Sequence, residues 1–119
     1  MGMHNFRELK IWKRSMDFAE NLYTISLDFP VNEKFGLTAQ IRSCAVSIPS
    51  NIAEGAGRST NKQFRYFLEI AMGSCNELQT QLELAFRFKY IREDIYSVMI
   101  SEASQIFRML LAFYNSLSE

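Results

Sequence analysis

Residues 60–86 read TNKQFRYFLEIAMGSCNELQTQLELAF and carry seven apolar residues at alternating steps of four and three. These residues are Phe64, Leu68, Ala71, Cys75, Leu78, Leu82 and Ala85. A heptad repeat places all seven side chains on one side of a helix, where they pack against neighbouring helices. Thr60 and Gln63 have the spacing of a capping box. The pattern predicts a long helix over residues 61–88, packed within a helical bundle.

The preceding helix is expected over residues 37–58. Its apolar row, again at steps of four and three, is Ile41, Ala45, Ile48 and Ile52. Pro49 lies inside this row and cannot donate an amide hydrogen to the carbonyl of Ala45, so we expect a kink in the second helix. Gly55 and Gly57 follow, and we expect them to adopt positive φ and end the helix.

Two apolar rows run along the first expected helix, over residues 6–28. One row contains Ile11, Phe18, Leu22 and Ile25, and the other contains Trp12, Met16, Ala19, Tyr23 and Leu27. Asn5 and Glu8 have capping-box spacing at its start, and Pro30 follows its end. A fourth helix is expected over residues 92–117. Without a competing strand pattern, the sequence predicts an all-α, antiparallel up-down-up-down four-helix bundle forming one domain over residues 1–119.

The composition indicates a folded protein outside the membrane. Of 119 residues, 48% are hydrophobic, yet no apolar run approaches the ~20 residues of a membrane span. Charges fall in the N-terminal stretch MGMHNFRELK, where a signal peptide would be apolar. We therefore expect a cytoplasmic protein without a membrane partner. Cys44 and Cys75 lack metal or redox spacing and are interpreted as small buried residues.

Charge is unevenly distributed along a chain of zero formal net charge. Residues 37–66 carry four lysines or arginines and one glutamate, a net charge of +3, and residues 67–119 balance it. Arg58, Lys62 and Arg65 are therefore candidate nucleic-acid contacts. The neutral total gives no domain-wide attraction for phosphate.

A stripe of polar residues lies beside the apolar row of the second helix. Its expected members, with the facing part of the third helix, are Arg42, Ser47, Pro49, Asn51, Glu54, Ser74 and Glu77. If the two helices fold back on each other, Glu54 should pair with Arg65 and Arg42 with Glu77. The small residues Gly73 and Ser74 should let the backbones approach closely. Asn51, a single amide beside the seam, is expected to fix the register or the oligomeric state.

The residues needed for common helical-bundle chemistry are missing. A di-metal carboxylate site requires two Glu-x-x-His pairs, and the chain has one histidine, His4, outside the expected helices. The same shortage excludes Ser-His and Cys-His nucleophile pairs and an Arg-His ribonuclease site. We therefore expect no catalytic, metal-binding or cofactor-binding residues, no cofactor, and no enzymatic activity.

Extra apolar residues on the first and third helices predict an oligomer, because a monomer would expose them as a contiguous patch. The expected interface residues are Phe18, Leu22, Ile25, Phe67, Ile70, Leu84 and Phe88.

The chain also resembles a known family along about half its length. The segments that carry the resemblance are FGLTAQIR at 35–42, VSIPSNIAEG at 46–55, GR at 57–58 and FLEIAMGSCNEL at 67–78. They are similar to the four-helix-bundle proteins encoded in intervening sequences of bacterial 23S ribosomal RNA genes. The resemblance implies a cytosolic homopentamer without an assigned enzymatic activity. A similar fold serves as the accessory variability determinant of diversity-generating retroelements, a basic pentamer that binds a reverse transcriptase and nucleic acid.

Two functional hypotheses follow. The first is a non-enzymatic, self-assembling bundle that acts as an interaction or accessory protein. The alternative is a nucleic-acid-binding accessory factor that uses residues 37–66 and has RNA, DNA, a reverse transcriptase or ribosomal RNA as partner. Salt-dependent binding of RNA or DNA distinguishes the two, because only the alternative requires phosphate contacts.

Overall fold

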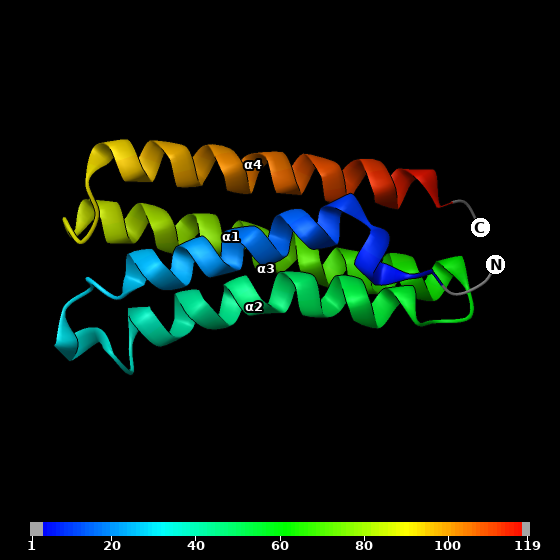
Figure 1. Ribbon diagram of the computed structural model, residues 1–119, viewed down its shortest axis with the longest axis horizontal. Helices are drawn as coiled ribbons and strands as arrows, with labels where there is room; N and C mark the ends of the chain where they lie inside the picture. The colour runs from blue at the N-terminus through cyan, green and yellow to red at the C-terminus, as the bar shows by residue number, and fades with distance from the viewer. Residues whose placement is uncertain (1–3, 118–119) are drawn as a thin grey trace.

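Four long helices form one elongated bundle of about 46 × 24 × 20 Å (Figure 1). The computed structural model describes residues 4–117. The helices are α1 (Lys10–Ser26), α2 (Leu37–Ala56), α3 (Asn61–Arg87) and α4 (Glu93–Ser116). Short 3-10 helices precede α1 (η1, Phe6–Glu8) and α2 (η2, Val31–Glu33), and this part of the chain has no strand. The expected all-α fold is confirmed.

Consecutive helices run antiparallel, as Figure 1 shows from the order of colours along each helix. Between α2 and α3, Ser47 contacts Ser74 while Gly55, further along α2, contacts the earlier residue Phe64. Among adjacent long helices the α2–α3 interface is the most extensive and the α1–α4 interface the least, and no Cα atoms of the diagonal pairs lie within 8 Å of each other. The α1–α4 seam is joined by Arg14, whose Nε donates to Glu102 at 2.9 Å.

The core lies where the heptad rows meet. All seven residues of the α3 row are buried, and so is the α2 row of Ile41, Ala45, Ile48 and Ile52. α2 continues as one α-helix through Pro49 to Ala56, and its kink stays a prediction. The sustained apolar spacing explains why the sequence predicted these two helices almost to the residue.

Of the two expected helix N-caps, one was wrong and one is confirmed. Asn5 accepts the Arg7 amide at 3.2 Å and so caps η1, whereas α1 begins only at Lys10 after an extended Leu9. Thr60 does cap α3, because its Oγ1 accepts the Gln63 amide at 3.2 Å.

Gly55 and Gly57 do not adopt the positive φ expected of them. Gly57 has φ −86°, and Gly55 lies inside α2. A Cβ at Gly55 would lie 2.7 Å from Cδ1 of Phe64 and 2.9 Å from Cβ of Phe67. Gly55 therefore provides the close approach of α2 and α3 that was expected at Gly73, where an added Cβ meets nothing within 4 Å.

The connections at the other end of the bundle are tied together by Glu33. Its carboxylate accepts the Leu37 amide at 3.0 Å and the Tyr90 hydroxyl at 2.8 Å. These two hydrogen bonds lower the pKa of Glu33. Tyr90 follows Lys89, which has φ 66° and ends α3 in a left-handed conformation. The α1–α2 connection is thus fixed to the α3–α4 turn.

Candidate functional site

The outward side of α2 carries no charged residue between Arg42 and Glu54. We call this surface the uncharged α2 face; its members are Ser43, Val46, Ser50 and Ala53. The first three are exposed and Ala53 is half-buried. A surface helix usually presents charged side chains to water. The uncharged run of eleven residues, 43–53, is longer than any within α1, α3 or α4. The uncharged α2 face therefore differs from the rest of the bundle surface.

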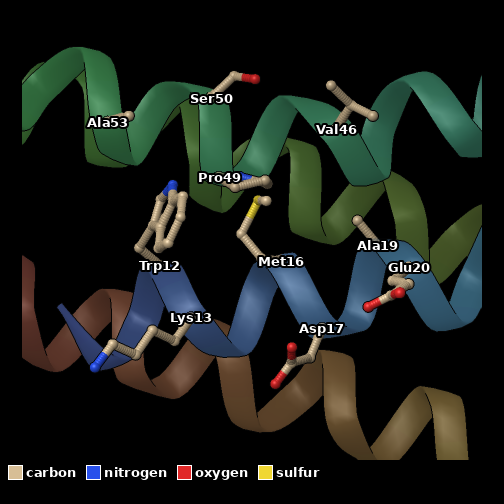
Figure 2. A pocket seen from close by; sticks show the side chains of 10 residues that line it. All are labelled: Trp12, Lys13, Met16, Asp17, Ala19, Glu20, Val46, Pro49, Ser50 and Ala53. Atoms are coloured by element: carbon tan, nitrogen blue, oxygen red, sulfur yellow. The ribbon is translucent and has the colours of Figure 1, made fainter. Parts of the chain in front are cut away.

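A groove of about 830 Å³ runs between α1 and α2 beside this face (Figure 2). Trp12 and Met16 of α1 point across the groove toward Pro49 of α2. Lys13 and Asp17 also line the groove, but their charged ends point away from α2 in this view. The floor between the two helices is therefore mainly apolar, and it joins the uncharged α2 face along one edge.

The structure corrects the assignment of the two apolar rows on α1. Phe18 and Leu22, expected at an oligomer interface, are 1% and 0% exposed and belong to the core. The row that faces outward contains Met16, Tyr23 and Leu27, which are 44%, 53% and 61% exposed. Because the rows lie about one residue apart around the helix, only one can point to the bundle axis.

Serine hydroxyls allow the other row to be buried. Ser15 and Ser26 are almost fully buried between the apolar residues of that row. Ser15 donates to the Trp12 carbonyl at 3.0 Å, and Ser26 donates to the Tyr23 carbonyl at 2.9 Å. Bonded in this way, a serine enters a core without an unsatisfied hydroxyl.

The remaining residues expected at an interface differ in exposure. Ile25, Phe67 and Ile70 are half-buried, whereas Leu84 and Phe88 are 39% and 52% exposed. Their role in an oligomer stays a prediction.

Part of the expected polar stripe lies together at the α2–α3 interface. The hydroxyl oxygens of Ser47 and Ser74 are 2.8 Å apart. Asn51 donates from Nδ2 to the Ser47 carbonyl at 2.8 Å and to the Ser47 hydroxyl at 3.0 Å. This network links the two helices. Pro49 lies on the opposite side of α2, in the groove with α1.

The charged members of the stripe have other contacts than the ion pairs expected for them. Arg42 turns toward α1, where its Nε donates to Ser26 Oγ at 2.7 Å and its guanidinium lies 4.2 Å from the centre of the Tyr23 ring. Glu54 pairs with Arg58, one turn further along its own helix. The expected partner of Arg42, Glu77, lies beside Cys44 instead.

Both cysteines are buried free thiols. Burial, together with the nearby Glu77 carboxylate, raises the pKa of Cys44 to about 11. Burial likewise raises the pKa of Cys75 to about 11, and its Sγ donates to the Ala103 carbonyl at 3.2 Å. Neither thiol is a thiolate at neutral pH, so neither is an activated nucleophile.

Within residues 4–117, no group of three or more His, Cys, Asp and Glu side chains could hold a metal ion. No helix in that range is both long and apolar enough to cross a membrane. His4 packs its ring against Phe64 and Phe113, at centroid distances of 5.1 and 6.1 Å.

The three cations expected to contact nucleic acid do not share one surface. Arg58 and Lys62 line a groove at the α2–α3 turn, together with the exposed Tyr66. Arg65 faces α4, where its guanidinium lies 4.2 Å from the centre of the Tyr114 ring. Sequence reasoning identified the two basic residues of the groove but missed Tyr66 beside them.

Comparison with known proteins identifies the family. The family described as 23S rRNA-intervening sequence protein matches residues 7–112, which includes nearly all of the four helices. The chain belongs to this family. The resemblance seen in the sequence is thereby confirmed over a longer stretch than the segments that first indicated it.

A solved structure of similar fold supports the same assignment. This intervening-sequence protein is similar to a crystal structure titled as a protein of unknown function from the S23 ribosomal protein family of Bacteroides thetaiotaomicron. The two chains are 25% identical, with a TM-score of 0.82 over 88% of this chain and 95% of the other. No curated protein matches the chain.

The sequence contains a signal for the uncharged α2 face, which the sequence analysis did not recognise. Residues 43–53 of this intervening-sequence protein include no Asp, Glu, Lys or Arg. Eleven residues make about three turns, so an outward face of the helix must be uncharged wherever the helix lies at the surface. That face became visible only once the structure showed which side of α2 points to solvent.

Proposed function

We propose that this intervening-sequence protein is a non-enzymatic, self-assembling helical bundle that acts as an interaction or accessory protein. The uncharged α2 face, with the apolar groove beside it, carries this proposal. The family and its solved relative give the fold, and they name no activity.

The uncharged α2 face has the properties of a helix-packing surface. Ser43, Ser50 and Ala53 are small, so a helix of another molecule can approach the α2 backbone closely. Met16 and Val46 are about half exposed at the edges of the groove, and burying them against a neighbour removes apolar area from water at about 25 cal/mol per Å². No charge on the face would lose its hydration during this packing.

A second copy of the chain is the proposed occupant. A closed ring uses two different surfaces of each subunit. The exposed Leu84 of α3 and Phe88, directly after α3, offer an apolar surface apart from the uncharged α2 face. The number of five subunits is proposed from the family resemblance alone, because neither surface determines the rotation that relates neighbouring subunits.

Light scattering coupled to size-exclusion chromatography tests self-association. A pentamer has a mass of about 69 kDa, five times the 13.8 kDa of one chain. A dimer or trimer mass would support self-association and reject the pentamer. A mass of 13.8 kDa at micromolar concentration would reject both.

The non-enzymatic part of the proposal rests on the available side chains. The chain has a single histidine, and both thiols keep their protons at neutral pH because burial raises their pKa. Purification of the native protein from its cells tests this part and the accessory role together. We expect a stoichiometric protein partner, and a copurifying metal or organic cofactor would contradict the proposal.

A further inference from the structure

Aromatic and basic side chains meet at the turn between α2 and α3. A shallow groove of about 590 Å³ is lined there by Arg58, Thr60, Lys62, Gln63, Tyr66 and Phe67. The Tyr66 ring is 58% exposed and rests edge-on against Phe67, with centroids 5.1 Å apart. The Arg58 guanidinium lies 4.7 Å from the centre of the same Phe67 ring. The exposed Tyr66 ring thus shares this groove with the two cations Arg58 and Lys62.

The N-terminal turn of α3 is basic, whereas helices usually favour acidic side chains there. Acidic side chains are favoured in the first turn, where the helix dipole is positive. The first turn of α3 has no acidic residue and carries Lys62 instead. The partial positive charge of the helix end and the side-chain cations therefore add, which favours an anionic ligand.

We propose that this cluster binds single-stranded nucleic acid, with a base stacked on Tyr66 and the adjoining phosphates beside Lys62 and Arg58. An exposed ring in a groove that two cations also line matches the two requirements of single-strand binding, which are a stacking surface and neutralisation of the backbone charge. A duplex hides its base faces and cannot use the ring. The proposal does not depend on self-association.

Glu54 gives the proposal an unusual internal control. Its carboxylate pairs with Arg58 and competes with a phosphate for that guanidinium. Removing this carboxylate should therefore tighten binding, whereas removing a cation or the ring should weaken it. Because these variants should change the affinity in opposite directions at one site, they distinguish specific binding from an effect of misfolding, which could only weaken binding.

Fluorescence anisotropy with a labelled 15-nucleotide oligothymidine tests the proposal. Tyr66→Ala should weaken binding about five- to hundredfold, and Tyr66→Phe should retain it because the ring is kept. Lys62→Gln should weaken binding and reduce the slope of log K against log salt by about 0.7. Glu54→Gln should tighten binding. Lys34→Gln is the matched charge control, since Lys34 lies over the Phe35 ring at the other end of the bundle.

Several results would overturn the proposal. These are no binding at 50 mM salt, equal affinity of wild type and Tyr66→Ala, or a duplex of the same length binding as tightly as the single strand. An acidic peptide that competes as well as the oligonucleotide would instead identify an anionic protein segment as the ligand and reject nucleic acid. Light scattering of each variant shows whether a change in affinity accompanies a change in assembly, so the two proposals can fail separately.

Discussion

Gly55 and Gly73 lie inside neighbouring helices in opposite surroundings, so alanine at each should change stability in opposite directions. Alanine in a helix interior is favoured over glycine by about 1 kcal/mol. At Gly73 the added Cβ meets nothing within 4 Å, so Gly73→Ala should gain most of that amount. At Gly55 the Cβ would lie 2.7 Å from Phe64, which is 1% exposed and whose ring packs against His4 and Phe113.

At Gly55, the cost of overpacking can be compared with the gain in helix propensity. Overpacking a well-packed core costs about 1–3 kcal/mol, which exceeds the propensity gain of about 1 kcal/mol. Gly55→Ala should therefore lower the free energy of unfolding by up to about 2 kcal/mol while Gly73→Ala raises it. Urea denaturation at one fixed protein concentration measures both. If Gly55→Ala is as stabilising as Gly73→Ala, the close contact between α2 and α3 at this position is wrong.

Three further predictions follow from the helix ends and the groove. The Leu37 amide and the Tyr90 hydroxyl lower the pKa of Glu33 in the folded protein. The ionised carboxylate therefore stabilises the fold at pH values above the pKa of Glu33 in the unfolded chain, and this stabilisation is lost as the pH falls through its pKa in the folded protein. Glu33→Gln should thus destabilise at pH 7 and have little effect at pH 2 in urea titrations; an equal loss at both would contradict this. Lys89→Gly should stabilise by about 1 kcal/mol, because glycine adopts φ 66° without steric cost, and an unchanged midpoint would count against the left-handed turn. Pro49→Ala should straighten α2, and a crystal structure superposing on wild type through both halves of the helix would reject the kink.

The four helices could be predicted because their apolar rows are long and regular. Seven consecutive heptad positions in α3 leave one helical phase that buries them all, and the structure buries all seven. In α1 two neighbouring rows are apolar, so the spacing alone does not decide which row points inward. The structure buries the row that contains Ser15 and Ser26, whose hydroxyls donate to backbone carbonyls of the same helix.

Contacts between side chains were less predictable than helix positions. The expected register of α2 and α3 agrees with the observed contact between Ser47 and Ser74. Arg42, however, faces α1 and donates a hydrogen bond to Ser26. The position of a long side chain depends on its rotamer and on its angle around the helix, and residue spacing sets neither closely. The exposed ring of Tyr66 was missed for the same reason.

We propose that the chain self-associates through the uncharged α2 face. Light scattering of Ser50→Glu beside Ser97→Glu tests this role, because both serines are exposed and only Ser50 lies on this face. Glutamate suits an exposed helix position, so both variants should keep the circular dichroism spectrum of the wild type. We predict that Ser50→Glu has the monomer mass of 13.8 kDa at concentrations where wild type and Ser97→Glu remain oligomeric. An unchanged oligomer mass for Ser50→Glu would contradict the claim.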